Sequence, residues 1–331
     1  MNILVTGAGG DIGLRIVAIL LRQGHHVKVL ATTTKEARSI RYPGVEIFVG
    51  NVSDARSIKG IAIDTDVVFH LADALFVADP EETLRQINYE GTINIAEECT
   101  ASHVKRFIFP SIPQVLGPHK TPMPPLEPED TVTQPSSFYA LYKRLCEQHL
   151  LILGEQGKLP VTILRLGTIY GPHTQLIKML TPRIARRSYR IPGTGNTLIN
   201  PVHIDDVVHA ILLALGTTRA SGQIYNVADN MPVTYKEFIY ELAGLIGAPH
   251  PKSTSVSLCR SVAAFVEAWA RITKTAPSVT NDTLTLGMSS FAADTVKTKA
   301  DLGFTPLYPT IYDGLPTCFA PGKERRPGKV A

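Results

Sequence analysis

Short apolar runs alternate with longer amphipathic segments through the first half of the chain. An apolar run of about four to eight residues is typical of a buried strand, whereas apolar residues spaced three and four apart indicate a helix. These patterns predict strands over residues 2–6, 27–31, 45–49, 66–71, 106–109 and 161–166. They predict helices over residues 14–22, 83–99 and 138–153, the first of them ended by Gly24. Strands that alternate with helices favour a doubly wound α/β fold, in which helices cover both faces of a parallel sheet.

The pattern becomes less regular after Gly171. It predicts a basic helix over residues 176–187, a strand over 198–204, a helix over 205–215 and a strand over 223–227. The last strand is expected to rejoin the main sheet, and the chain is mostly helical from about residue 232. We therefore expect two domains. The larger α/β domain covers residues 1–167 and is rejoined by about 201–228, and the smaller, mostly helical domain covers residues 168–200 and 229–317.

The segment over residues 118–135 contains six prolines with acidic residues between them. The interior of a helix or strand does not tolerate this composition, because proline lacks the backbone N–H group and clashes with the preceding turn. We interpret the segment as a long surface loop before the helix over residues 138–153. Such a loop is either a functional lid or disordered, and the sequence leaves both open.

The composition is that of an ordinary globular protein, with 44% hydrophobic and 19% charged residues among 331 and a formal net charge of +4. Basic residues gather only in residues 318–331, which we interpret as a disordered, solvated tail. The apolar runs 16–21 and 210–215 are far shorter than the ~18 residues of a membrane span. No signal peptide is recognisable. We therefore expect a cytoplasmic protein without a membrane or nucleic-acid partner. The four scattered cysteines and the histidine spacing predict neither disulfides nor a metal site.

A glycine-rich segment, VTGAGGDIG over residues 5–13, joins the first predicted strand to the first predicted helix. Glycine permits a tight turn and lets backbone N–H groups approach a pyrophosphate, and the third glycine lets helix and strand pack closely. A plain turn is the alternative, but the second strand follows at the right distance. We therefore interpret residues 1–167 as a dinucleotide-binding domain, with the pyrophosphate over Gly7, Gly10 and Gly13. The smaller domain then becomes the substrate-binding domain.

Tyr139 and Lys143 lie four residues apart at the start of a predicted helix, so they share one face of it. A neighbouring ammonium group favours the phenolate and lowers the pKa of a tyrosine. Such a tyrosine can exchange a proton with a substrate hydroxyl while a nicotinamide exchanges a hydride. A surface pair without function is the alternative, but the glycine segment upstream favours the catalytic interpretation.

The glycine spacing T-G-x-x-G-x-I-G and the Y-x-x-x-K pair resemble the short-chain dehydrogenase/reductase family. Further segments resemble its extended branch, which includes nucleotide-sugar epimerases and dehydratases, dihydroflavonol reductases and hydroxysteroid dehydrogenases. They are FHLA at residues 69–72, NYEGTIN at 88–94, RLGTIYGP at 165–172, VHIDDV at 202–207 and LGFTP at 302–306. The resemblance implies a Rossmann-type fold, a nicotinamide cofactor beside Leu71 and Ala72, and Tyr139, Lys143 and Asn88 as catalytic residues. It also implies a homodimer through the helices that start near Thr83 and Phe138.

One catalytic position departs from the family. The family places a Ser or Thr three residues before a V-Y-G segment, and that count reaches Ile112 here. Ser111 lies one residue early and points differently if the segment is extended. A missing donor to a reacting oxygen typically reduces the rate by ~10²–10³-fold. Either another group donates, with Ser111, Gln114 and Thr168 as candidates, or the chemistry is altered.

The end of the second strand bears on the choice of cofactor. An acidic residue there would bind the adenosine ribose of NAD, but this chain has Ala31. Hydroxyls and cations follow it, which suits the 2′-phosphate of NADP, so the sequence favours NADP over NAD. Asn51 and Val52 resemble the family's adenine-side pair. The expected cofactor contacts are Gly7, Gly10, Asp11, Ile12, Gly13, Thr32, Thr33, Lys35, Asn51, Val52, Leu71, Ala72, Tyr139 and Lys143.

The expected substrate contacts are Ile112, Gln114, Thr168 and Ile199. Nucleotide-sugar members of the family usually carry an arginine where this chain has Ile199 and an asparagine where it has Thr168. Their loss weakens the nucleotide-sugar interpretation, although four arginines over residues 183–190 can compensate. A helical stripe is predicted to be core or to wall an apolar substrate pocket; it comprises Leu258, Val262, Phe265, Val266, Trp269 and Ile272.

Three functions follow from these observations. The first is an NAD(P)-dependent oxidoreductase that acts on a secondary alcohol or ketone. The second is a nucleotide-sugar epimerase or dehydratase in which the hydride returns to the same substrate. The third is a cofactor-binding protein without redox turnover, because Ile112 replaces the serine.

Overall fold

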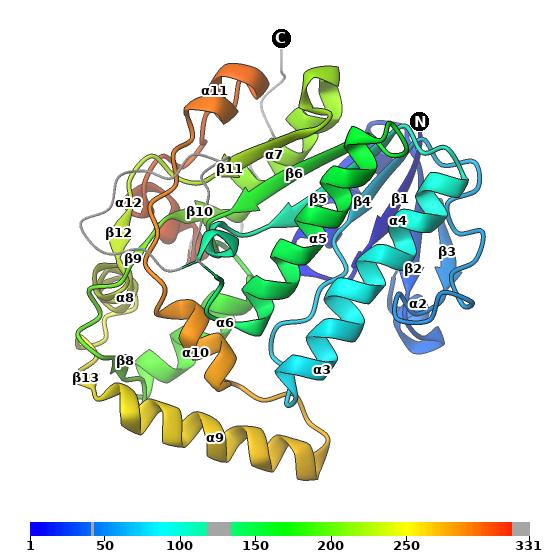
Figure 1. Ribbon diagram of the computed structural model, residues 1–331. Coiled ribbons are helices and arrows are strands. Elements are labelled where there is room, and N and C mark those ends of the chain that lie inside the picture. Colours follow the sequence, from blue (N-terminus) through cyan, green and yellow to red (C-terminus); the bar gives the residue numbers. More distant parts are fainter. Residues whose placement is uncertain (41–42, 118–133, 320–331) are drawn as a thin grey trace.

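A computed structural model describes residues 1–40, 43–117 and 134–319, and in these residues a seven-stranded parallel sheet carries helices on both faces (Figure 1). The strand order is β11-β6-β5-β4-β1-β2-β3. The strands are β1 Asn2–Thr6, β2 His26–Ala31, β3 Val45–Val49, β4 Val67–His70, β5 Arg106–Ser111, β6 Val161–Leu166 and β11 Gln223–Val227. The predicted α/β fold is confirmed, and the strand over residues 223–227 rejoins the sheet beside β6 as expected.

Two apolar layers hold helices to the sheet. On one face, α1 (Asp11–Arg22) and α7 (Ile204–Gly216) pack through side chains such as Ile16 and Ile211. On the other face, α4 (Gly91–Ala101) and α5 (Phe138–Glu155) pack through Ile95 and Leu150. The strand order reverses between β1 and β4. In open α/β sheets, ligands bind at the carboxyl ends of the strands beside such a reversal.

The helix predicted over residues 83–99 is three consecutive pieces. It consists of α3 (Pro80–Leu84), a π-helical turn η1 (Arg85–Glu90) and α4. A π-turn inside a helix is frequently associated with a functional site. The prediction of a single regular helix is therefore wrong at residues 85–90. There the contacts of Asn88 with the rest of the fold accompany the π-helical conformation of the backbone.

The remaining elements, apart from α2 (Thr34–Ser39) at the sheet edge, belong mainly to a smaller region with its own apolar cluster, which includes Tyr170, Leu180, Phe238 and Ile311. The helices are α6 Gln175–Ala185, α8 Tyr235–Leu245, α9 Val256–Thr273, α10 Asn281–Gly287, α11 Val296–Leu302 and α12 Ile311–Gly314. The short strands are β7 Thr168–Tyr170, β8 Ile191–Pro192, β9 Leu198–Ile199, β10 Pro201–His203, β12 Val233–Thr234 and β13 Ser253–Thr254. The strand predicted over residues 198–204 is thus two strands, β9 and β10. The assignment of the two regions to separate domains stays a prediction.

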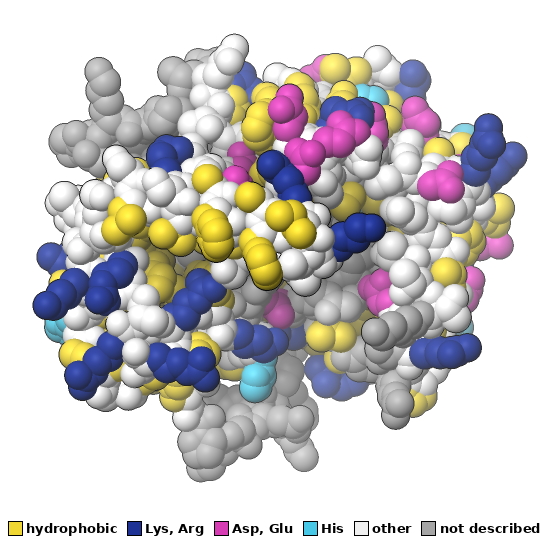
Figure 2. Space-filling model, turned by 90° about the horizontal axis from the view of Figure 1, so that it is seen from below, with side chains coloured by type: hydrophobic (Ala, Val, Ile, Leu, Met, Phe, Trp, Pro, Cys, Tyr) yellow, Lys and Arg dark blue, Asp and Glu magenta, His cyan; other side chains and the backbone are white. Residues whose placement is uncertain are grey.

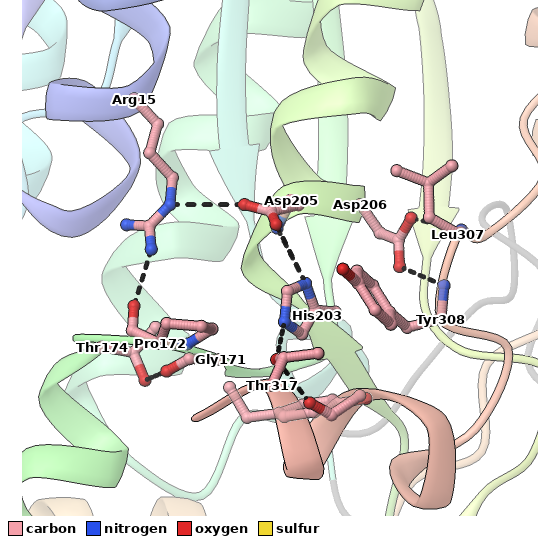
Figure 3. A network of polar contacts seen from close by, with 12 residues as sticks. Arg15, Gly171, Pro172, Thr174, His203, Asp205, Asp206, Leu307, Tyr308 and Thr317 are labelled. Atoms are coloured by element: carbon pink, nitrogen blue, oxygen red, sulfur yellow. Dashed lines mark hydrogen bonds and ion pairs between the residues drawn. The ribbon is translucent and has the colours of Figure 1, made fainter. Parts of the chain in front are cut away.

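A polar network joins the smaller region to α1 (Figure 3). Arg15 of α1 donates to the carbonyl of Pro172 at 2.6 Å and forms an ion pair with Asp205 at 3.4 Å. His203 accepts from the backbone N–H of Asp205 and contacts Thr317 at 3.0 Å. Asp206 accepts two backbone N–H groups from the segment before α12. The network holds the smaller region beside the start of α1, where the glycine segment lies.

The apolar stripe on α9 is not part of the core, because five of its six side chains are half or more exposed (Figure 2). Cys318, the first residue of the predicted tail, ends a short 3-10 helix, Leu315–Cys318, whereas residues 320–331 lie outside the described residues. The proline-rich loop over residues 118–135 lies outside the described residues except for its last two residues.

In the described ranges, no helix combines the length and apolar content needed to cross a membrane.

A buried carboxyl generates a testable prediction about stability. Asp229 accepts a hydrogen bond from the Tyr170 hydroxyl at 3.1 Å, and burial raises the pKa of Asp229 to about 8. The folded chain therefore keeps a proton that the unfolded chain loses near pH ~4, so the free energy of unfolding falls as the pH rises through this window. We expect Asp229→Asn to flatten this slope by up to ~1.4 kcal/mol per pH unit. Urea unfolding at several pH values between about 5 and 9 measures it, and an unchanged slope would contradict the assignment.

Candidate active site

The glycine turn lies at the carboxyl end of β1, where neighbouring backbone approaches closely. Gly7 has a φ of 64°, and a Cβ atom there would collide with the carbonyl of Leu71. A Cβ atom on Gly13 would collide with the carbonyl of Gly7. Gly10 caps α1 without a side-chain hydrogen bond, so its N-terminal N–H groups are open to an anion. These features fit the pyrophosphate of a dinucleotide.

Two predicted contacts beside this turn serve the protein's own structure. The Asp11 carboxylate accepts from the backbone N–H of Gln175 at 2.7 Å and so caps the start of α6. Ile12 packs against the apolar layer below α1. Any contact of Asp11 with a cofactor therefore has to come from its backbone, and a cofactor contact of Ile12 stays a prediction.

The end of β2 carries a carboxylate that the sequence reasoning missed. The Glu36 carboxylate accepts from the backbone N–H of Thr32 at 2.8 Å. Its other oxygen lies 3.3 Å from the position of a Cβ atom on Gly9, so it faces the glycine turn. Thr33 caps α2 by accepting from the Glu36 N–H at 3.1 Å. The side chain of Lys35 lies outside the described residues. The acid absent at Ala31 is thus supplied from α2.

The segment after β3 is fixed by α4. Asn51 accepts from the backbone N–H of Ser53 at 3.0 Å, and Val52 packs against Gly91. The side chain of Asn94 donates to the carbonyl of Val52 at 2.8 Å. Asn51 is exposed beside the sheet edge, where it is available to a ligand.

Tyr139 and Lys143 converge on the carboxylate of Asp73. The Tyr139 hydroxyl donates to Oδ2 of Asp73, and Lys143 Nζ lies 3.1 Å from Oδ1. Lys143 also donates to the carbonyl of Pro110 at 3.1 Å. Both residues of the pair are buried, with 7% and 5% of their surface exposed. The start of α5 is held by Asp282, which accepts from the backbone N–H groups of Phe138 and Tyr139.

Asp73 changes the expected electrostatics of the tyrosine. Burial, followed by the negative charge of Asp73 and the hydrogen bond to it, raises the pKa of Tyr139 well above its ordinary value. The net lowering expected from Lys143 is not found, because burial and Asp73 act in the opposite direction and the ammonium is paired with the same carboxylate. Tyr139 is therefore held in its protonated form.

Asn88 positions Asp73. Its amide oxygen accepts from the backbone N–H of Ala74 at 2.8 Å, and its amide nitrogen donates to the Ala74 carbonyl at 2.8 Å. The backbone carbonyl of Asn88 accepts from the side chains of Thr92 and Cys146. The π-turn thus clamps the residue next to Asp73. The sequence predicts Asn88 as catalytic, and these contacts give its side chain a positioning part.

Ser111 and Ile112 occupy different environments. Ser111 ends β5 and is 2% exposed, and its hydroxyl has no hydrogen-bond partner among the described residues. Ile112 packs against the cluster that contains Tyr139 and Tyr142. The assignment of Ile112 rather than Ser111 to the serine position of the family stays a prediction. The polar group that contacts the Tyr139 hydroxyl is the carboxylate of Asp73.

The remaining predicted substrate residues are spread around the site. Gln114 is half-buried in a 3-10 turn, Pro113–Leu116, after β5. Thr168 is half-buried in β7, which pairs with β10. Ile199 is 4% exposed and belongs to the apolar cluster of the smaller region, so it contributes to packing. Contacts of these residues with a substrate stay predictions.

The sequence gives only weak indications of the roles of Asp73 and Glu36. Asp73 follows the FHLA segment at the carboxyl end of a buried strand, where ligands of α/β sheets bind. Glu36 lies one helical turn after Thr32. Neither signal states what the carboxylate contacts, because that depends on the packing of α5 and the glycine turn.

Comparisons with known proteins agree with this geometry. The sequence profile of the family described as "NAD dependent epimerase/dehydratase family" matches residues 3–228. The chain is 28% identical over 279 residues to a 2-alkyl-3-oxoalkanoate reductase of Stenotrophomonas maltophilia (strain K279a), covering 81% of this chain and 82% of that protein. It is 27% identical over 256 residues to a UDP-glucose 4-epimerase of Vibrio cholerae, covering 75% and 76%. The fold resembles a Thermus thermophilus UDP-glucose 4-epimerase in complex with NAD, with a TM-score of 0.75, 22% identity and coverage of 96% and 97%.

Proposed function

This chain belongs to the NAD-dependent epimerase/dehydratase family, the extended branch of the short-chain dehydrogenases, and it is an enzyme of that family. From this premise we propose that it is a reductase, which converts a ketone to a secondary alcohol with Tyr139 as the proton donor. The observation that carries the proposal is the hydrogen bond from the Tyr139 hydroxyl to Asp73.

The protonation state of Tyr139 supports the reductive direction. Ketone reduction requires a donor for the carbonyl oxygen, whereas alcohol oxidation requires a base that first removes a hydroxyl proton. Asp73 favours the protonated tyrosine, because a phenolate beside a carboxylate is repelled. Epimerisation also begins with oxidation of an alcohol, so the same contact disfavours it.

Several side chains of this chain have separate roles in the proposed reduction. A nicotinamide dinucleotide, when bound, supplies the hydride to the carbonyl carbon. The Tyr139 hydroxyl gives its proton to the carbonyl oxygen, and the phenolate left behind regains a proton from water. Lys143 places a positive charge beside the phenolate as it forms, and Asn88 keeps Asp73 in place. Ile112 offers an apolar surface where relatives have a hydroxyl.

We propose NAD as the cofactor rather than NADP. The sequence favours NADP because Ala31 lacks a carboxylate, but Glu36 brings one to the end of β2. A carboxylate there suits the two hydroxyls of an adenosine ribose and repels a 2′-phosphate. The protein in the solved structure with 22% identity binds NAD, which is consistent with this choice.

The proposed substrate is a ketone with a largely apolar body. The named activity of the 28% identical relative is reduction of an oxoalkanoate, which supports this class. Ile199 and Thr168 stand where nucleotide-sugar enzymes carry polar clamps, and Arg190 is turned to the carbonyls of Arg187 and Tyr189. A cytoplasmic location completes the proposal, together with the homodimer through α4 and α5 that the family resemblance implies.

Removal of the tyrosine hydroxyl tests the function. With a panel of medium-chain 3-oxo acids and aliphatic ketones, we expect the chain to consume NADH. We expect Tyr139→Phe to reduce the rate at least ~10²-fold, because the proton donor is lost. Tyr142→Phe, a change in the same helix away from Asp73, is the matched control with little effect. If a UDP-sugar interconverts without net consumption of NADH, the epimerase interpretation is right; if Tyr139→Phe keeps full reductase activity, Tyr139 is not the donor.

A second prediction concerns Asp73. Asp73→Asn removes the negative charge beside Tyr139, so the pKa of the tyrosine falls and the phenolate forms at lower pH. We expect the rise of the alcohol oxidation rate with pH to occur at lower pH in Asp73→Asn. The pH profile of oxidation, with Asp79→Asn as a control in the same segment, measures the shift. A profile that does not move would mean that Asp73 does not govern this proton.

A third prediction concerns the cofactor. Glu36→Ala is expected to lower the preference for NADH over NADPH by roughly tenfold or more, which corresponds to ~1.4 kcal/mol. Glu46→Ala, which changes an exposed acid on β3, is the control. Steady-state kcat/KM values for both cofactors measure the ratio. An unchanged ratio in Glu36→Ala would contradict the assignment of Glu36 to the ribose.

A further inference from the structure

The helix α9 presents an uncovered apolar row, the α9 stripe, formed by Leu258, Val262, Phe265, Trp269 and Ile272. These side chains are between 50% and 77% exposed, and none of the described residues covers them. Figure 2 shows them as a continuous yellow row across one face of the molecule. Monomeric proteins rarely expose a contiguous apolar patch of this kind unless it binds something.

The helix is attached to the protein through its opposite side. Ala263 and Ala270 are its buried residues, and Glu267 accepts from the backbone N–H of Asn281 at 2.6 Å. Arg271 Nε donates to the carbonyl of Ala78 at 3.0 Å. This last bond fixes the end of α9 beside the segment that leads from Asp73 to α3. The stripe therefore has a fixed orientation on α9, a helix that lies along the lower edge of the molecule in Figure 1.

Cations lie near both ends of the stripe. Lys274 is exposed just after the last turn of α9, whereas Arg260 and Arg271 lie on the side of the helix away from the stripe, because none of the residues three or four positions from them belongs to it. At the other end, β8 pairs with β13, which brings Arg190 next to Lys252, and both are exposed. Figure 2 shows Lys and Arg side chains at both ends of the row and beside it. The acid of α9, Glu267, is partly buried and engaged with Asn281.

We propose that the α9 stripe docks on an anionic lipid surface. A helix with an apolar face lies in the plane of a membrane interface with its apolar side chains below the headgroups, and aromatic side chains are favoured there. Arg190 and Lys252 at one end of the stripe and Lys274 at the other then contact lipid phosphates, as basic groups near an anionic leaflet do. The sequence predicts no membrane partner, and the exposure of the stripe revises that expectation. The proposal concerns peripheral binding and stands independently of the redox chemistry.

A second copy of the chain fits this surface less well. The stripe has the spacing of a coiled-coil seam, but such seams select partners through opposite charges at the flanking positions. Here these positions hold Cys259, Ser261, Ala268 and Thr273, which carry no such charges. A second α9 would also bring no available acid to the cations, since Glu267 is engaged. Anionic headgroups supply the missing charge.

Trp269 is the single tryptophan of the chain, so its fluorescence reports on the stripe directly. We expect vesicles of phosphatidylcholine with phosphatidylglycerol to shift the emission of the full chain to shorter wavelength. Vesicles of phosphatidylcholine alone should bind much more weakly, and salt should reduce binding to the anionic vesicles. The absence of a shift with anionic vesicles, or an equal shift with both kinds, would overturn the proposal.

Single variants distinguish the apolar from the electrostatic contribution to vesicle binding. Phe265→Ser is expected to weaken vesicle binding by roughly tenfold, as loss of a buried aromatic side chain implies. Leu307→Ser, at an apolar side chain that is 63% exposed outside the stripe, is the matched control without effect. Lys252→Gln should weaken binding to anionic vesicles only. If Phe265→Ser instead converts a dimer to a monomer in sedimentation while vesicles bind neither form, the stripe is an interface between copies and the lipid proposal is wrong.

Discussion

The carboxylate of Asp73 receives both the hydroxyl of Tyr139 and the ammonium of Lys143. An isolated charge is expensive to bury, and Asp73, with 29% of its side chain exposed, offsets that of Lys143 inside the site. The same carboxylate determines the chemistry, because a tyrosine that donates to it keeps its proton. Ile112, which the residue count along the chain predicts at the position usually held by a serine, packs against the cluster that contains Tyr139. The proposed reductase chemistry depends on this shared acceptor more than on the tyrosine and lysine alone.

The backbone around Asp73 explains why the carboxylate stays in place. Asn88 binds both backbone groups of the next residue, Ala74, and does so from a π-helical turn whose carbonyl is then left for Thr92 and Cys146. On the other side, the end of β4 lies against Gly7, where no side chain fits. The segment after β4 thus contacts both the glycine turn, through Leu71, and the proposed proton donor Tyr139, through Asp73.

The sequence predicted the elements that depend on local pattern. β1, β3, β6 and β11 begin and end where the sequence predicts them. The apolar runs of β1 and β6 are continuous because strands buried on both faces need apolar residues throughout. The interruption of the helix at Asn88 was not predictable, since it results from a contact with Ala74 across the site. Asp73 and Glu36 were missed for the same reason: an acid has no pattern of its own, and its role follows from what the fold brings to it. The α9 stripe shows a related limit, because periodicity tells which side chains share a face and not what covers that face.

The most direct test of this account is the pKa of Tyr139. Tyrosines labelled with ¹³C at the ring can be followed by NMR through an alkaline titration, with Tyr139 assigned by its absence in Tyr139→Phe. We expect the Tyr139 signal to stay that of a protonated phenol while exposed tyrosines titrate near pH ~10, and to titrate at lower pH in Asp73→Asn. A Tyr139 that ionises with or before the exposed tyrosines in the unaltered chain would contradict the claim that Asp73 holds it as a proton donor.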